Sequence, residues 1–412
     1  MKFGMFKSAL FTGFFLFVFG FSALDLGSVT DGSYELKSSA FVSSPKPVGL
    51  DSLVLSFDEY LDNTVDSMKS PGAAVALVYK GEILLLKGYG IKRAGGRDTI
   101  DAHTAFRLGS VSKGFASVLT GIMVEEGSLS WDDRIQEYLS DFRLKDTSSA
   151  SHMTIRNILS HTTGLPEHTY TDMLDNGFEY DRIKSDLANV PVIAKPGQVY
   201  GYQNVAYSLI GDVLFTVSGK DYNNLLQDKI FQPLNMKDAS TDYTSFCYNP
   251  NTAMPHVRVG SGWKTKPKND RYYSASPASG INASASDMAK WLLALTGYYP
   301  EVVDNQTIKA VSDHYIETPR KSAYRRNWKS LEKTYYGLGW RVFDVNGHDI
   351  IYHGGYVEGF RAEIAFDPET KLGIAVLFNA NTPVASQCVP HFVNSFFDTC
   401  LPANPSAFVA DN

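Results

Sequence analysis

The stretch AAVALVYKGEILLLKGYG, residues 73–90, contains two apolar runs that meet at Lys80-Gly81. Two runs rich in Val, Leu and Ile around a short glycine-containing turn are typical of a β-hairpin. Two similar stretches lie near the other end of the chain, at residues 335–355 around Asn346-Gly347 and at residues 361–379 around Asp367-Pro368. The sequence therefore predicts antiparallel strands at both ends of the chain.

The segment between these hairpins, residues 105–335, has mostly helical patterns separated by long loops. Helical spacing also precedes the first hairpin at residues 53–68 and follows the last one at residues 388–401. The simplest arrangement is an α+β fold. Its antiparallel sheet is built from both chain ends, is flanked by helices, and carries an inserted, mainly helical subdomain.

The composition excludes some classes of protein. The chain has 412 residues, of which 44% are hydrophobic and 20% charged, and its net charge is −6. This is enough for a large core, and the negative balance argues against a nucleic-acid partner. Cys247, Cys388 and Cys400 are too few for a disulfide scaffold and lack zinc-site spacing. One disulfide would suit an exported protein, but the sequence does not identify the pair.

The N-terminus has the pattern of a secretory signal peptide over residues 1–23. Lys2 and Lys7 precede an apolar run from Ala9 to Phe21, and Ser22 and Ala23 follow it. The run is short for a membrane span, although an uncleaved N-terminal anchor is the alternative. We expect a leader or linker at residues 24–50, one folded domain at 51–402 and a tail at 403–412. The protein is then secreted and meets a membrane only through its signal peptide.

Ser110 and Lys113 form a Ser-x-x-Lys pair at the start of a strongly apolar helical pattern over residues 107–127. Residues three apart share a helix face, and a partly desolvated lysine can take the proton of a serine hydroxyl. The same spacing occurs at Ser43/Lys46 and Ser330/Lys333, but neither pair opens a buried-looking helix. The alternative is that Ser110 only caps the helix, a common role of serine.

Two further stretches carry polar groups beside buried-looking elements. Tyr202 and Asn204 stand just before an apolar helix, where a tyrosine can shuttle protons and an asparagine can bind a substrate amide. Packing and capping are the alternative roles. His353, Gly354 and Gly355 stand where the strand of the second hairpin is expected to end, and the glycines would leave its edge open to a ligand backbone.

The stretches SVSK at 110–113, YQN at 202–204 and HGG at 353–355 together resemble the three motifs of the serine β-lactamase and penicillin-binding-protein superfamily. The Tyr-x-Asn form of the second motif resembles that of the class C β-lactamase branch. This branch includes DD-peptidases, D-aminopeptidases and esterases. The segments ILSHTTGLP at 158–166 and ASGINASASDMAKWL at 278–292 also resemble that branch, and the similarity runs from about residue 50 to about residue 400.

The resemblance implies one site between the sheet and the helical subdomain, without a metal or organic cofactor. Ser110 would be the nucleophile, Lys113 its activating partner and Tyr202 the acid/base. Asn204 would orient the substrate. The backbone N–H groups of Ser110 and Tyr356 would form an oxyanion hole, in which each donor typically contributes about 3 kcal/mol.

His353 departs from the β-lactamases proper, which usually carry lysine there. An ordinary histidine is mostly neutral at pH 7, so a fixed charge for a penicillin carboxylate is not expected from it. We therefore expect an exported serine hydrolase of the bacterial periplasm that acts on a cell-wall D-peptide, a β-lactam or an ester. Peptidase or esterase activity is favoured over efficient β-lactamase activity. The alternative is a catalytically silent binding or scaffold protein that retains the fold.

Overall fold

The computed structural model describes residues 46–67, 69–319 and 326–401. The predicted signal peptide, most of the predicted leader and the predicted tail lie outside these residues. Helix α1 (Leu50–Asp66) begins three residues before the predicted start at Leu53, because Leu50 is fully buried and belongs to the core. Within the described ranges, no helix has the length and apolarity that crossing a bilayer requires. All three cysteines are free thiols.

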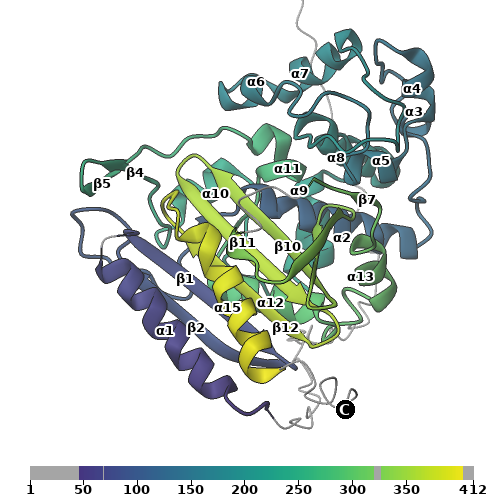
Figure 1. Cartoon of the computed structure of the whole chain (residues 1–412). Coiled ribbons are helices and arrows are strands. Elements are labelled where there is room, and N and C mark those ends of the chain that lie inside the picture. The colour runs from purple at the N-terminus through teal and green to yellow at the C-terminus, as the bar shows by residue number, and fades with distance from the viewer. Residues whose placement is uncertain (1–45, 68, 320–325, 402–412) are drawn as a thin grey trace, which may run out of the picture. The chain divides into compact units, whose positions relative to one another are not determined.

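An eight-stranded sheet has the order β2-β1-β12-β11-β10-β9-β8-β7, and every neighbouring pair is antiparallel. The N-terminal hairpin joins the C-terminal strands where Ala73 pairs with Phe378, and Figure 1 shows these purple and yellow strands side by side. The predicted sheet built from both chain ends is thus confirmed. Its strands are β1 (Gly72–Tyr79), β2 (Glu82–Gly90), β7 (Ile316–Glu317), β8 (Leu331–Tyr336), β9 (Arg341–Val345), β10 (His348–Val357), β11 (Phe360–Asp367) and β12 (Leu372–Phe378).

The sheet is buried on both faces. All residues of β1 are buried, and they alternate between two hydrophobic clusters: Val75 and Leu77 face one, Ala76 and Val78 the other. Helices α1 and α15 (Ala385–Cys400) cover the first face, and α12 (Ala285–Leu295) covers the second. A near-continuous apolar run in a strand is the expected signature of such two-sided burial.

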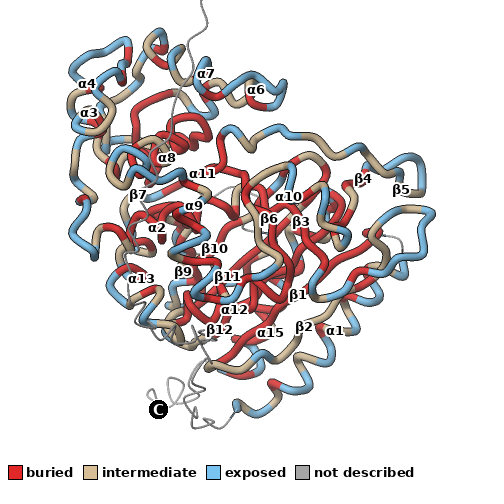
Figure 2. The backbone as a smooth tube through the Cα atoms, turned by 180° about the vertical axis from the view of Figure 1, so that it is seen from behind, coloured by how far each residue is buried: buried red, intermediate tan, exposed pale blue. Residues whose placement is uncertain are grey.

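The mainly helical insertion lies between β2 and β7, as predicted. Buried residues run through the sheet and the central helices, whereas the outer helices expose much of their surface (Figure 2). Besides α12, the helices of the insertion are α2 (Ser112–Glu125), α3 (Ile135–Tyr138), α4 (Thr147–His152), α5 (Ile155–Leu159), α6 (Thr171–Asp175), α7 (Tyr180–Asp186), α8 (Val205–Ser218), α9 (Tyr222–Leu226), α10 (Tyr243–Tyr248), α11 (Ser276–Ser279) and α13 (Asn305–Val311). Two small two-stranded sheets pair β3 (Phe106–Arg107) with β6 (Asn282–Ala283) and, as a hairpin, β4 (His256–Val259) with β5 (Gly262–Thr265).

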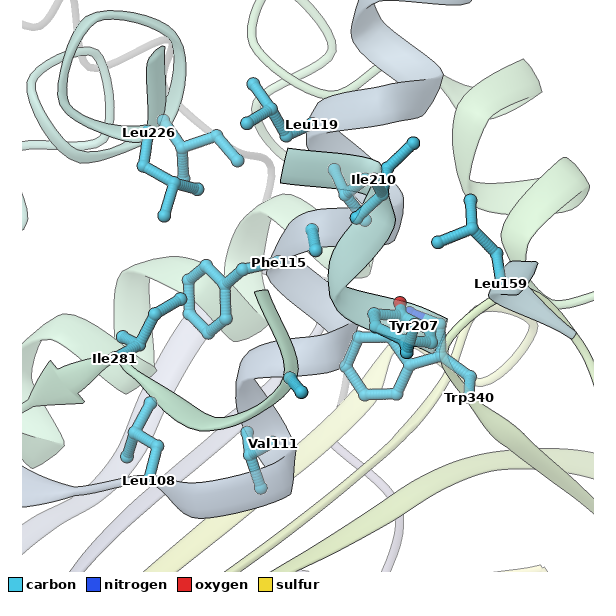
Figure 3. Packing of buried hydrophobic residues seen from close by; sticks show 14 of the residues in the cluster. Leu108, Val111, Phe115, Leu119, Leu159, Tyr207, Ile210, Leu226, Ile281 and Trp340 are labelled. Carbon is cyan, nitrogen blue, oxygen red and sulfur yellow. The ribbon is translucent and has the colours of Figure 1, made fainter. Parts of the chain in front are cut away.

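Helix α2 runs through the core and packs against α8, α11 and α13 of the same insertion. Figure 3 shows Phe115 and Leu119 of α2 beside Tyr207 and Ile210 of α8, with Trp340 packed below them. Burial of each such side chain contributes about 1.5–3 kcal/mol. The core therefore fixes the helix that directly follows the predicted nucleophile, Ser110.

Candidate active site

Ser110 lies in a single 3-10 turn, Gly109–Val111, that leads directly into α2. Lys113 follows one turn later, with its Nζ atom 3.5 Å from Ser110 Oγ. The N-cap residue of α2 is Val111, which makes no side-chain cap hydrogen bond. The structure thus does not support the capping role for Ser110, whose hydroxyl faces the lysine instead.

Lys113 is completely buried among acceptors and aromatic rings. Its ammonium donates to Asn204 Oδ1 at 2.7 Å and to the Ala278 carbonyl at 3.1 Å. Burial, together with the positive charge of Arg341, holds the pKa of Lys113 well below its ordinary value. The side chain is therefore biased toward the neutral amine, the form that can accept a proton.

Tyr202 and Asn204 reach the same place from the loop before α8. The Nζ atom of Lys113 lies 4.7 Å from the centre of the Tyr202 ring. Asn204 is the N-cap residue of α8, but its side chain makes no cap hydrogen bond. Besides accepting from Lys113, it donates to Thr171 Oγ1 at 3.3 Å. The motif residues thus face one another, and the capping role weighed for Asn204 is not observed.

Strand β10 passes directly beside the Ser110 turn. A Cβ atom placed on Gly355 would lie 1.9 Å from the Leu108 carbonyl oxygen and 3.0 Å from the Ser110 nitrogen. One placed on Gly109 would lie 2.8 Å from the Tyr356 nitrogen. Real Cβ atoms do not approach so closely, so both positions need glycine. This close contact brings the backbone nitrogens of Ser110 and Tyr356 into one region, as an oxyanion hole requires.

The prediction that the strand ends near His353 is wrong, because β10 continues to Val357. Pairing with β11 runs as far as Val357, whereas pairing with β9 ends at Tyr352. The edge beyond Tyr352 meets the Ser110 turn instead of another strand. A Cβ atom on Gly354 would point away from the one on Gly355. It would lie 2.9 Å from Glu363 Oε2, not near Ser110.

A series of hydrogen bonds links the backbone of Gln203 to His161, Tyr336 and His353. The Gln203 backbone N–H donates to His161 Nδ1 at 3.1 Å, and Tyr336 Oη lies 3.1 Å from both His161 Nε2 and His353 Nε2. His353 Nδ1 lies 2.9 Å from the Gly354 carbonyl, which can only accept. These end partners fix the direction: His161 donates to Tyr336, and Tyr336 donates to His353.

The side chains of His161, Tyr336 and His353, which form this hydrogen-bonded series, are buried and neutral. Burial, with a further contribution from the charge of Arg341, holds the pKa values of His161 and His353 well below their ordinary value. Burial also raises the pKa of Tyr336 well above its ordinary value, so it keeps its proton. The sequence did not reveal this link between His161 and His353.

Arg341 is the functional candidate that the motifs did not reveal. Its guanidinium carbon lies 5.6 Å from the ring centres of both Tyr202 and Tyr336, and its Nη1 donates to Tyr200 Oη at 3.3 Å. A signal was present in the sequence. Counting outward from the Asn346-Gly347 turn pairs position 341 with position 352, beside His353, and the structure has this register.

The chain is similar to known proteins along most of its length. A family model described as Beta-lactamase matches residues 57–391. Unguisins hydrolase ungD′ of Aspergillus campestris is 27% identical over 357 residues, which cover 82% of this chain and 63% of that protein. The chain therefore spans less than two thirds of the length of this relative.

Two solved structures have the same fold. The octameric penicillin-binding protein homologue from Pyrococcus abyssi has a TM-score of 0.72 at 23% identity, covering 83% of this chain and 77% of that one. The D-amino acid amidase from Ochrobactrum anthropi has a TM-score of 0.68 at 19% identity, covering 84% and 99%. At these identities the likeness shows the fold alone.

Proposed function

Because the chain belongs to the Beta-lactamase family, we propose that it is a serine hydrolase that cleaves an amide or an ester through an acyl-Ser110 intermediate. The setting of the Lys113 amine carries this proposal. A neutral amine has two hydrogens and one lone pair. Asn204 Oδ1 and the Ala278 carbonyl accept the two hydrogens, which leaves the lone pair for the hydroxyl of Ser110.

In the proposed acylation, Lys113 Nζ takes the proton of Ser110 as Oγ bonds to the substrate carbonyl carbon. The carbonyl oxygen becomes an oxyanion that accepts hydrogen bonds from the N–H groups of Ser110 and Tyr356. The bond to the leaving nitrogen or oxygen then breaks, and that atom receives the proton through the Tyr202 hydroxyl. Water next attacks the acyl carbon and gives a proton to the same groups. The bond to Ser110 Oγ then breaks, Oγ regains that proton, and the acid is released.

We propose a D-peptide, another amide or an ester as substrate rather than an efficiently hydrolysed β-lactam. The neutral state of His353 supports this, since it offers no fixed charge to a penicillin carboxylate. Arg341 supplies a positive charge beside Tyr202, which supports substrates that carry a carboxylate elsewhere. The structurally similar amidase is named for its action on D-amino acid amides, which is compatible with this class.

The experiment compares the wild type with Ser110→Ala on nitrophenyl esters, D-Ala-D-Ala peptides, a D-amino acid amide and a chromogenic cephalosporin. We expect turnover of at least one of the first three, loss of that turnover in Ser110→Ala, and a fluorescent-penicillin adduct on Ser110 by intact mass. An adduct without any turnover would favour the silent binding protein. Equal inactivity of both proteins, with no adduct, would refute the hydrolase.

We also propose export to the bacterial periplasm, on the strength of residues 1–23. N-terminal sequencing of the protein recovered from its native compartment tests this. A start near residue 24 is expected, whereas an intact Met1 in a membrane fraction would indicate an uncleaved anchor.

A further inference from the structure

The two backbone segments that carry the proposed oxyanion donors are held by one loop segment. This segment, Lys266–Arg271, follows the β4–β5 hairpin and is called the strap below. It lies more than 150 positions after Ser110 and more than 80 before Tyr356, yet it contacts residues next to both. Neither the family motifs nor the proposed chemistry uses it.

On the Tyr356 side, the strap binds Glu358, in the turn after β10. Glu358 Oε2 accepts from Asn269 Nδ2 at 2.9 Å and from Lys266 Nζ at 3.3 Å, and its Oε1 accepts from Arg271 Nη1 at 3.2 Å. The Glu358 side chain is only 14% exposed, so the surrounding protein limits its freedom. Its position two residues after Tyr356 couples these bonds to the Tyr356 amide.

On the Ser110 side, the strap binds Arg107. The guanidinium of Arg107 donates to the Asn269 carbonyl at 3.2 Å and to the Arg271 carbonyl at 2.6 Å. Arg107 is 2% exposed and lies in β3, three residues before Ser110. Its ring contact with Tyr273, at 4.3 Å, fixes the guanidinium further.

Asn269 and Arg271 therefore bind both segments, Glu358 through their side chains and Arg107 through their carbonyls. We propose that the strap sets the separation of the Ser110 and Tyr356 amides, with Glu358 as a positioning residue for the oxyanion hole. This rests on the proposed function, since an oxyanion must form there. Small errors in donor position are costly because the donors must point at the charge that develops in the transition state.

The test compares Glu358→Gln and Glu358→Ala with the wild type on a substrate that depends on Ser110. We expect kcat to fall about tenfold in Glu358→Gln and about 100-fold in Glu358→Ala, with KM nearly unchanged. Inhibition by phenylboronic acid, whose adduct with serine is tetrahedral, should weaken by the same factors. The control is Glu126→Gln, which removes an ion pair with Lys229 at the other end of α2.

A merely structural role for Glu358 predicts something else: a lower melting temperature, with kcat and boronic acid affinity unchanged in the folded protein. That result would overturn the proposal, as would a change confined to KM. Failure of the proposed function is seen separately, as activity that survives Ser110→Ala.

Hydrogen–deuterium exchange gives a reading that needs no turnover. Release of the strap in Glu358→Gln should speed exchange about tenfold in peptides containing Ser110 and in those containing Tyr356, relative to Glu126→Gln. Unchanged exchange in both segments would refute the strap even in an inactive protein.

Discussion

Strand β10 is anchored at two places by different kinds of group. The hydrogen bonds at His353 are called the neutral hold below, and those at Glu358 the charged hold. At His353 the partners are neutral and buried: Tyr336 donates to the imidazole, and His161 donates to Tyr336. At Glu358, past the end of the strand, the partners are partly exposed polar side chains, of which Lys266 and Arg271 are charged. Burial opposes ionisation of Glu358, yet the bonds from Asn269 and Lys266 still keep its pKa below the ordinary value. Acid should weaken the neutral hold, because it protonates the histidines. Salt should weaken only the charged hold, because it screens the ion pairs.

The largest effect should come from Gly355→Ala, between the two holds. The new Cβ would lie 1.9 Å from the Leu108 carbonyl oxygen, so β10 must move away from the Ser110 turn. We expect kcat/KM to fall at least about 100-fold and the free energy of unfolding to fall by about 2–3 kcal/mol. Activity assays and urea unfolding measure both. Gly262→Ala is the control, because its Cβ would have only ordinary contacts; equal results for the two variants would contradict the close approach.

Tyr336→Phe should break the neutral hold alone. It removes the hydroxyl between two imidazoles and leaves a buried donor on His161 and a buried acceptor on His353 without partners. We expect a loss of about 2–3 kcal/mol in the free energy of unfolding. Urea unfolding measures it against Tyr335→Phe, at the neighbouring position of β8. A loss below that of the control would mean that the chain contributes nothing to stability.

Acid should destabilise the neutral hold. The folded-state pKa of His353 is depressed by burial and by the charges of Arg341 and Arg361, so the unfolded chain binds a proton first. Stability is therefore complete above pH ~6.5 and falls as the pH drops below it, by about 1.4 kcal/mol per pH unit for each such histidine. Unfolding measured between pH 6 and pH 5 should have a shallower slope in His353→Asn by about that amount. Parallel slopes would show that His353 is protonated in the native state.

Arg341→Gln should move the pH profile of the enzyme. The charge of Arg341 helps to depress the pKa of Lys113, so its removal raises that pKa and leaves less neutral amine at pH 7. We expect the limb of kcat that requires neutral Lys113 to shift to higher pH, with a loss of about threefold at pH 7 that is recovered in alkali. A loss that is the same at every pH would assign Arg341 to substrate binding instead.

The smallest effect should be that of salt on the charged hold. Raising NaCl from about 0.1 M to about 1 M shortens the Debye length from about 10 Å to about 3 Å. We expect kcat to fall about twofold in the wild type, because the Lys266 and Arg271 pairs with Glu358 are partly exposed. Glu358→Gln should not respond. Equal salt responses in the two proteins would show that these pairs are already ineffective.

Local patterns were enough for much of this protein. The turn pairs Lys80-Gly81 and Asn346-Gly347 located two hairpins, and the sheet formed by both chain ends followed from them. The approach of Lys113 to Ser110 was also predicted from their spacing of three residues, although Ser110 lies in the 3-10 turn that precedes α2 and not in α2 itself. Period and turn chemistry act over a few residues, so the sequence reveals them directly.

Contacts between distant segments were decided only by the tertiary structure. The sequence could not show that His161 and Tyr336 would join His353, or that the strap would bind both Arg107 and Glu358, because nothing in local spacing encodes such meetings. Nor could it show that β10 continues past His353, since two successive glycines normally indicate a strand end. Here Gly355 is needed because the backbone of the Ser110 turn leaves no room for a Cβ atom, whereas the ends of side chains such as Glu363 crowd Gly354. The sequence thus determined which groups carry the proposed chemistry, whereas packing decided their charge states and their distances.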